Sequence, residues 1–177
     1  MVKYFAKSLP IFLLTLLLSL VFVPCAVAAE LTQTHETKNG LSLNYPAGWN
    51  AVENAADQTV ALALMNPAAP AFGMTITVTE GVPEGSMTMS EADAKAAFSQ
   101  LGSDFKMLEY GKTKVAGQDA TLIEYSFKAN DIPMQNRQVM FTSGSKGIIV
   151  TSSFMDAGAV AELHKIVEAI ESSITLK

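Results

Sequence analysis

Three consecutive predicted strands in the C-terminal half constrain the fold more than any other part of the sequence. Residues 120–128, 134–142 and 147–154 are rich in β-branched and aromatic residues, which favour a pleated, half-buried strand. The links at 130–133 and 143–147 contain Asn, Asp, Pro, Gly and Ser, the residue types of turns. Because such short links cannot hold a parallel crossover, the stretch predicts an antiparallel meander.

Further strands are predicted on the N-terminal side of the meander. Their apolar residues recur with the period of a strand; the segments are 41–45, 50–53, 59–65, 73–80 and 105–115. We expect the first two segments to form a hairpin. Segment 59–65 is apolar on both faces, which predicts a central strand covered on both sides.

Two helices, both amphipathic, complete the predicted elements. Ser90 and Asp93 form a capping-box pattern before the first helix, whose apolar positions are expected to reach Leu101 and to end at Gly102. The second helix carries a wide apolar stripe, made of Val160, Leu163, Ile166, Val167, Ile170 and Ile174. Its charged residues, Glu171 among them, are expected to face solvent. Strands occur in runs and do not alternate with helices, so we predict an α+β protein, a mostly antiparallel sheet flanked by helices.

Residues 1–28 have the pattern of a secretory signal peptide. Two lysines precede an apolar run, and residues 26–28 (Ala-Val-Ala) supply the small side chains that a signal peptidase reads. We therefore expect a signal peptide at 1–28, a flexible lead-in at 29–40 and a single domain at 41–177. The protein is expected to be periplasmic or secreted.

Cys25 leaves two alternatives to this processing open. It is the only cysteine, and acylation there would make the protein a lipoprotein tethered to the membrane. An uncleaved anchor is the other alternative, although the apolar run is short for a bilayer span. With Cys25 in the signal, no disulfide can form, and the exported domain must be held together by packing alone.

The remaining sequence lacks the patterns of nucleic-acid, catalytic, metal and cofactor sites. Ten basic residues stand against seventeen acidic ones after the signal, a net charge of −7 without a basic stripe, which argues against a nucleic-acid partner. There is no Cys–His pair, Gly-x-Ser-x-Gly elbow, His-x-x-x-His, paired-cysteine or calcium-loop spacing, or phosphate-binding glycine motif. Met87 and Met89 leave a Cu(I) site open as an alternative, although methionine more often fills gaps in a core. His35 and His164 are more typical of structural histidines than of a base or ligand. We expect no enzyme activity.

Residues 40–49, Gly-Leu-Ser-Leu-Asn-Tyr-Pro-Ala-Gly-Trp, resemble the opening of PsbP-like and DcrB-like domains. The turn at 116–117 and the strands at 121–127 and 148–154 also fit that family. The resemblance implies an α-β-α sandwich and a binding or assembly role, because members include the PsbP subunit of the oxygen-evolving complex and envelope proteins such as DcrB. It assigns no functional residue, since the matching positions are turn and core positions; Trp49 is expected to fill the core. The acidic charge favours a general bacterial envelope protein.

Four adjacent polar residues in the middle strand of the meander form the candidate partner surface: Gln135, Asn136, Arg137 and Gln138. A solvated strand face is the alternative interpretation of this cluster. We therefore predict an exported, non-catalytic binding or assembly module of the bacterial cell envelope, which acts through protein–protein contacts with an envelope protein. The alternative function is a small-ligand or lipid carrier with an apolar pocket. Membrane contact is expected only if Cys25 is lipidated.

Overall fold

Strands dominate the described part of the chain, which also has one helix in its middle and one near its C-terminal end. The computed structural model describes residues 30–38, 40–53, 60–66, 72–79, 81–155 and 160–177. In chain order the elements are β1 (Gln33–Glu36), β2 (Leu41–Tyr45), β3 (Asn50–Val52), β4 (Val60–Met65), β5 (Phe72–Thr79), α1 (Glu91–Phe98), β6 (Ser103–Val115), β7 (Gln118–Ala129), β8 (Ile132–Ser143), β9 (Lys146–Phe154), α2 (Val160–Ser173) and β10 (Thr175–Leu176). The predicted signal at 1–28 and Cys25 lie outside the described residues. Within the described residues, no helix is long and apolar enough to cross a membrane.

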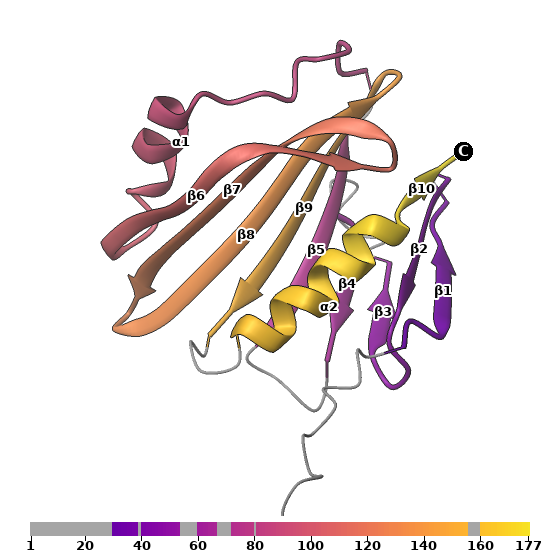
Figure 1. Cartoon of the computed structure of the whole chain (residues 1–177), viewed down its shortest axis with the longest axis horizontal. Helices are drawn as coiled ribbons and strands as arrows, with labels where there is room; N and C mark the ends of the chain where they lie inside the picture. Colours follow the sequence, from indigo (N-terminus) through magenta and orange to yellow (C-terminus); the bar gives the residue numbers. More distant parts are fainter. Residues whose placement is uncertain (1–29, 39, 54–59, 67–71, 80, 156–159) are drawn as a thin grey trace, which may run out of the picture.

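The strands form two antiparallel sheets (Figure 1). The large sheet has the order β3-β4-β5-β9-β8-β7-β6, and the small sheet has the order β1-β2-β10. Strands β7, β8 and β9 pair in sequence order, with Tyr125 opposite Asn136 and Asn136 opposite Ser153. The predicted meander is therefore confirmed, and so is the α+β class with a mostly antiparallel sheet.

The main hydrophobic core lies between the large sheet and α2. Met74, Ile76 and Val78 of β5 point into it, as the predicted alternation requires, and Ile76 is fully buried. The cluster includes Leu41, Leu43, Trp49, Leu62, Leu64, Met74, Ile76, Val150, Val167 and Ile170. It thus joins α2 to both sheets, and the predicted core position of Trp49 is confirmed.

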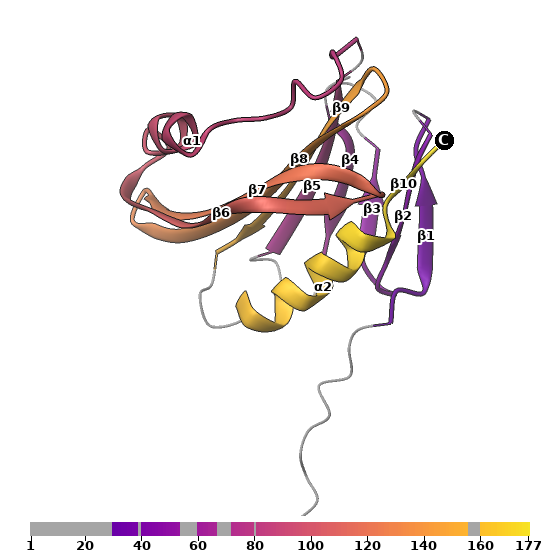
Figure 2. The same ribbon diagram turned by 45° about the horizontal axis from the view of Figure 1, so that its top comes forward.

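Helix α1 lies on the opposite side of the large sheet from α2 (Figure 2). Its predicted cap is confirmed, because Ser90 Oγ accepts a hydrogen bond from the backbone N–H three residues later. Ala94 is its one fully buried residue, and Phe98 stacks on Tyr125 of β7 with ring centroids 4.4 Å apart. The predicted apolar stripe is only partly present: Ala97 is exposed, the helix ends at Phe98, and Leu101 is 49% exposed.

Two predictions about the N-terminal strands are wrong. The hairpin of 41–45 with 50–53 does not form, because β2 pairs with β1 and β10, whereas β3 pairs with β4 at the edge of the large sheet. The lead-in at 29–40 is not loose throughout, because 33–36 form β1. Hydrophobic periodicity does not reveal β1, since this edge strand has mostly exposed, polar side chains.

Candidate functional site

The four residues of the predicted partner surface lie on two different sides of the large sheet. Side chains alternate along a strand, so Gln135 and Arg137 of β8 point toward α2, and Asn136 and Gln138 point to the α1 side. Arg137 is only 6% exposed, because it is bonded to Glu171 of α2. The single surface predicted from four adjacent residues is therefore corrected to two separate pairs.

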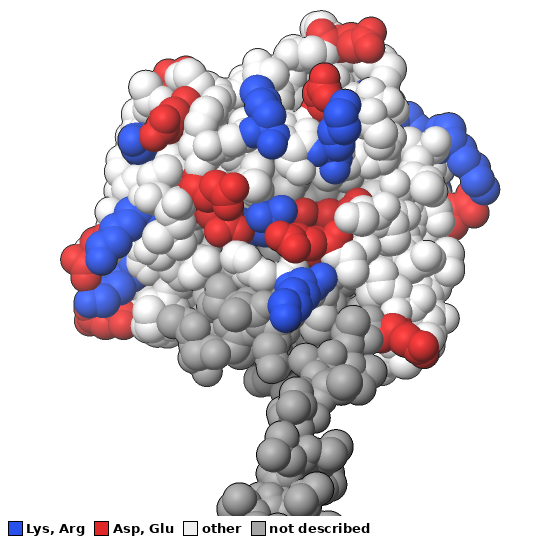
Figure 3. All heavy atoms as spheres, in the orientation of Figure 1, with Lys and Arg blue, Asp and Glu red and all other residues white. Residues whose placement is uncertain are grey.

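Arg137 is the centre of a buried ionic network. Its Nη1 donates a hydrogen bond to Oε1 of Glu124 on β7 at 3.0 Å, and its Nη2 donates to Oε2 of Glu171 on α2 at 3.1 Å. The Nδ1 of His164 lies 3.6 Å from the same oxygen of Glu124. Figure 3 views the molecule from the side of α2 and shows acidic side chains around a basic one near the centre. The network joins two strands to α2.

Burial and ion pairing shift the pKa values of this network in opposite directions. Burial lowers the pKa of Arg137, but its bonds to Glu171 and Glu124 outweigh this effect, so the pKa is raised above its ordinary value. Burial is also the largest influence on Glu171 and raises its pKa, and the bonds to Arg137 offset only part of that rise. A guanidinium already bonded to two carboxylates has few donors left for a ligand. The network therefore serves to hold α2 on the sheet.

Neither Glu124 nor Glu171 is predicted from the sequence as a buried partner of Arg137. The prediction that Glu171 faces solvent is wrong, because this residue is only 4% exposed. A signal was available, because residues four apart in a helix share a face, and Val167 is fully buried. An acidic residue beside an apolar stripe can thus indicate a buried cation on the facing sheet.

The α1 side of the large sheet is covered only in part. α1 and its aromatic contacts lie over β6 and β7, and their cluster extends to Met140 of β8 and Ile149 of β9. Strands β3, β4 and β5 and the C-terminal part of β9 carry described side chains that are exposed or half-buried on this side. Two rows of residues cross these strands in register. One row is Val52, Ala63, Thr75, Thr151 and Gln138, and the next is Asn50, Met65, Gly73, Ser153 and Asn136. We call these ten residues the open neutral face, because none of them is charged.

The open neutral face changes from apolar to polar across the strands. At its β3–β4 end, Val52 and Met65 are 47% and 48% exposed. At its β8 end, Gln138 Nε2 donates a hydrogen bond to Thr151 Oγ1 at 3.1 Å, and the Asn136 amide donates to a tyrosine hydroxyl of β7. The Oδ1 of Asn136 has no hydrogen-bond partner among the described residues. That oxygen is buried, so the half-buried Gln138 is the amide side chain that the surface offers at this end. The surface thus combines exposed apolar area with one accessible amide side chain and no charge.

The open neutral face also explains why the prediction for segment 59–65 is wrong. On the α2 side, Leu62 and Leu64 of β4 are fully buried, as expected. On the other side, Ala63 is half-buried and Met65 is exposed, so this strand is covered on one face only. Apolar residues on both faces of a strand indicate a covering helix only where a helix reaches that strand, and the short α1 lies over other strands.

His35 and His164 each lie near one acidic side chain among the described residues. The described residues contain no group of three or more His, Cys, Asp and Glu side chains that could hold a metal ion. His35 Nε2 lies 3.0 Å from Oε1 of Glu53. His164 contacts Glu124 through Nδ1 and lies 3.4 Å from the Gln135 side-chain nitrogen through Nε2. Both histidines therefore have ordinary structural partners.

Solved structures identify the fold. The solution structure of cyanobacterial PsbP (CyanoP) from Synechocystis sp. PCC 6803 is similar, with a TM-score of 0.62 and 18% identity over 82% of this chain and 92% of that one. The chain has a PsbP-like fold. LpqN, involved in cell envelope biogenesis of Mycobacterium tuberculosis, is also similar, with a TM-score of 0.57 and 12% identity over 82% of this chain and 90% of that one.

A third similar structure with this PsbP-like fold is the Ran-binding protein Mog1p of Saccharomyces cerevisiae. Its TM-score is 0.58, with 8% identity over 81% of this chain and 94% of that one. No protein family model and no curated protein matches the sequence. At these identities the likeness shows the fold alone. The fold resemblance noted in residues 40–49 and in the meander is confirmed.

Proposed function

We propose that this protein is an exported, non-catalytic binding module of the bacterial cell envelope, which acts through protein–protein contacts at the open neutral face. One observation carries the proposal: ten neighbouring positions on the sheet carry no charge, in a protein whose residues are 16% charged. Charged residues are depleted at the centre of protein–protein interfaces, where desolvating them is costly. A partner can bury a neutral surface of this kind without the cost of desolvating charged side chains.

The proposed partner has a flat, largely uncharged surface. Val52 and Met65 would contact its apolar side chains, while Gln138 would offer amide groups for hydrogen bonds. Of the four sequence-predicted residues, Asn136 and Gln138 belong to this surface, and Gln135 and Arg137 do not. Within the α-β-α sandwich that the resemblance implies, α1 would be the incomplete layer, and the partner would cover the rest of that side.

The PsbP-like fold supports a binding role by analogy. Mog1p is a Ran-binding protein, and LpqN is involved in cell envelope biogenesis. One description names a protein partner, and the other names a process of the cell envelope. The analogy therefore supports the broad class of binding modules, and the choice of the envelope rests on the signal pattern at 1–28.

Export and anchoring are tested by the intact mass of the protein from the envelope fraction of its native host. Cleavage after residue 28 gives a protein that starts at Ala29, as the proposal expects. A chain that starts at Cys25 and carries acyl groups would be a lipoprotein, whose partners lie within reach of the membrane. A chain that retains residue 1 would contradict export by a cleaved signal.

Photo-crosslinking at two equally exposed positions tests the proposed surface. Met65 and Leu108 are each 48% exposed, but Leu108 lies on β6, at the opposite edge of the large sheet. With a photoreactive amino acid at Met65, we expect a protein adduct in the native envelope that the same amino acid at Leu108 does not form.

A second substitution makes this test specific. Thr75→Arg places a charge in the middle of the open neutral face, at an exposed position where the fold should tolerate it. We expect Thr75→Arg to abolish the adduct formed from Met65 while leaving the melting temperature unchanged. Equal adducts from Met65 and Leu108, or an adduct that survives Thr75→Arg, would disprove the proposed surface.

A further inference from the structure

A pocket lies on the α2 side of the large sheet, at the ends of β6, β7, β8 and β9. One row of residues crosses these strands in register: Lys106, Ser126, Gln135 and Phe154. All four line the pocket, together with Asp104 and Lys128. Its volume is about 560 Å³, within the range of roughly 300–1,000 Å³ that is typical of small-molecule sites. The pocket and the open neutral face are on opposite sides of the sheet.

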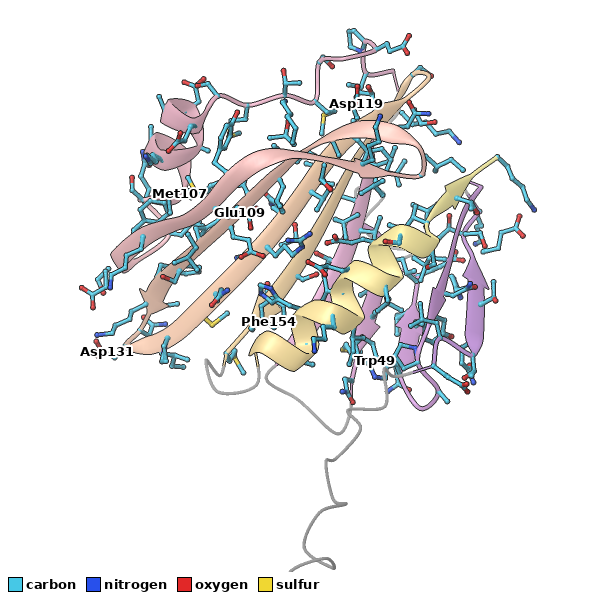
Figure 4. All side chains as sticks on the ribbon, viewed as in Figure 1. Trp49, Met107, Glu109, Asp119, Asp131 and Phe154 are labelled. Carbon is cyan, nitrogen blue, oxygen red and sulfur yellow. The ribbon has the colours of Figure 1, made fainter. Side chains whose placement is uncertain are left out.

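The inner wall of the pocket is held in place by contacts with α2. Phe154 is 1% exposed, and its ring centroid lies 5.3 Å from that of His164. The side-chain nitrogen of Gln135 lies 3.4 Å from Nε2 of His164. Figure 4 shows Phe154 beside the N-terminal part of α2. A wall whose side chains are already packed loses little conformational entropy when a ligand binds.

The outer wall of the pocket carries a positive charge. Lys128 Nζ lies 2.7 Å from Oδ2 of Asp104. This bond to Lys128 is the main reason that the pKa of Asp104 is lowered, and the charge of Lys106 contributes as well. Two lysines and one aspartate leave one net positive charge, in a protein whose own net charge is −5. An anion is therefore attracted to this pocket and repelled by the protein as a whole.

We propose that this pocket binds a small amphipathic monocarboxylate. Lys106 and Lys128 would hold its carboxylate, and the hydroxyl of Ser126 would donate a further hydrogen bond. Its apolar part would lie along Pro133 and Met134, which also line the pocket and are accessible there. One negative charge matches the net charge of the pocket. A phosphate group, with its higher charge, is better matched by arginine or by a helix N-terminus, and no arginine lines the pocket. The site goes beyond the proposed protein contact, because it uses the other side of the sheet.

Titration with sodium octanoate, followed by ¹H–¹⁵N NMR of the purified protein, tests this site. We expect shifts of the amide signals of Lys106, Ser126 and Gln135 with increasing octanoate. Octyltrimethylammonium has the same apolar chain with a positive head, and we expect it to cause no saturable shift there. No shift with octanoate, shifts located elsewhere, or equal binding of the two compounds would overturn the proposal.

Two matched charge reversals identify the group that recognises the carboxylate. Lys128 and Lys114 are exposed lysines that each pair with one aspartate, at 2.7 Å and 2.6 Å, but Lys114 does not line this pocket. Lys128→Glu is expected to weaken octanoate binding roughly tenfold, since it replaces an attraction by a repulsion at short range. Lys114→Glu is expected to leave binding unchanged. An equal effect of the two variants would mean that only the net charge of the protein matters, which contradicts a site.

Ser126→Trp tests the pocket without changing its charge. Ser126 is half-buried in the middle of the row, and an indole ring there would fill the space that the ligand needs. We expect loss of octanoate binding while the amide spectrum away from the pocket remains that of the folded protein. Undiminished binding by a folded Ser126→Trp variant would place the ligand outside this pocket.

Discussion

The two sides of the large sheet differ in how completely a helix covers them. α2 has 14 residues and α1 has eight, which correspond to lengths of about 21 Å and 12 Å. Adjacent strands lie about 4.8 Å apart, so α2 crosses several strands, and α1 covers little beyond β6 and β7. On the α2 side, a core from both sheets surrounds a paired arginine. On the α1 side, a small aromatic cluster leaves the neighbouring strands open.

This difference separates a side of the sheet that is built for stability from a side that is available for the proposed binding. The α2 side contains the larger of the two apolar clusters, and it can contain charges because each has a partner nearby. On the α1 side, the helix covers only part of the sheet. The ten residues of the open neutral face lie on the strands that it leaves uncovered, and none of them is charged. We infer that the covered side stabilises the protein and the open side is free to bind.

Removing the central cation is expected to have the largest effect on the covered side. Arg137→Met should lower the free energy of unfolding by about 3–5 kcal/mol, because it leaves two buried carboxylates without their cation. Urea denaturation measures the change. The triple variant Arg137→Met, Glu124→Leu, Glu171→Leu is the control, and it should recover most of the loss, since no buried charge remains. A single variant as stable as the original protein would show that the network does not hold α2.

A pair of truncations compares the two helices directly. Ile170→Ala removes a fully buried side chain of α2 and is expected to cost about 2–5 kcal/mol. Phe98→Ala removes the half-buried ring that joins α1 to Tyr125, and its cost should be smaller, because less apolar area is buried there. Hydrogen exchange should show α1 opening before α2. Equal costs, or slower exchange in α1, would remove the contrast between the two sides.

The smallest expected effect is a pH dependence that originates at Glu171. Burial raises its pKa above the ordinary value of 4.5. A raised pKa means that the folded state binds the proton more tightly, so this contribution to stability is present below pH 4.5 and is lost as pH rises through the folded-state pKa. We expect the stability of the original protein relative to Glu171→Gln to fall as pH rises through this window. Urea denaturation at several pH values measures it, and a rise would mean that pairing with Arg137 outweighs burial.

Local patterns were sufficient to predict most elements of the fold. The alternation in residues 41–45, 73–80 and 147–154 and the cap at Ser90 depend on neighbours along the chain, so the sequence alone reveals them. The candidate site was found only in part. Asn136 and Gln138 lie on the open neutral face, but the strand period of two sends Arg137 to the other side. The strand period of two is itself a property of the sequence, and it separates Asn136 and Gln138 from Gln135 and Arg137.

The sequence by itself determined which segments are strands and helices, because periodicity and caps are local properties of the chain. The tertiary structure alone decided which strands pair and what each helix covers. β2 leaves its neighbour β3 and joins the C-terminal end of the chain, where the backbone N–H of Asn44 donates a hydrogen bond to Ser173 Oγ, 129 residues away. The ionic network, the open neutral face and the charged pocket depend on such long-range contacts, since each brings together residues from strands or helices that are distant in the sequence.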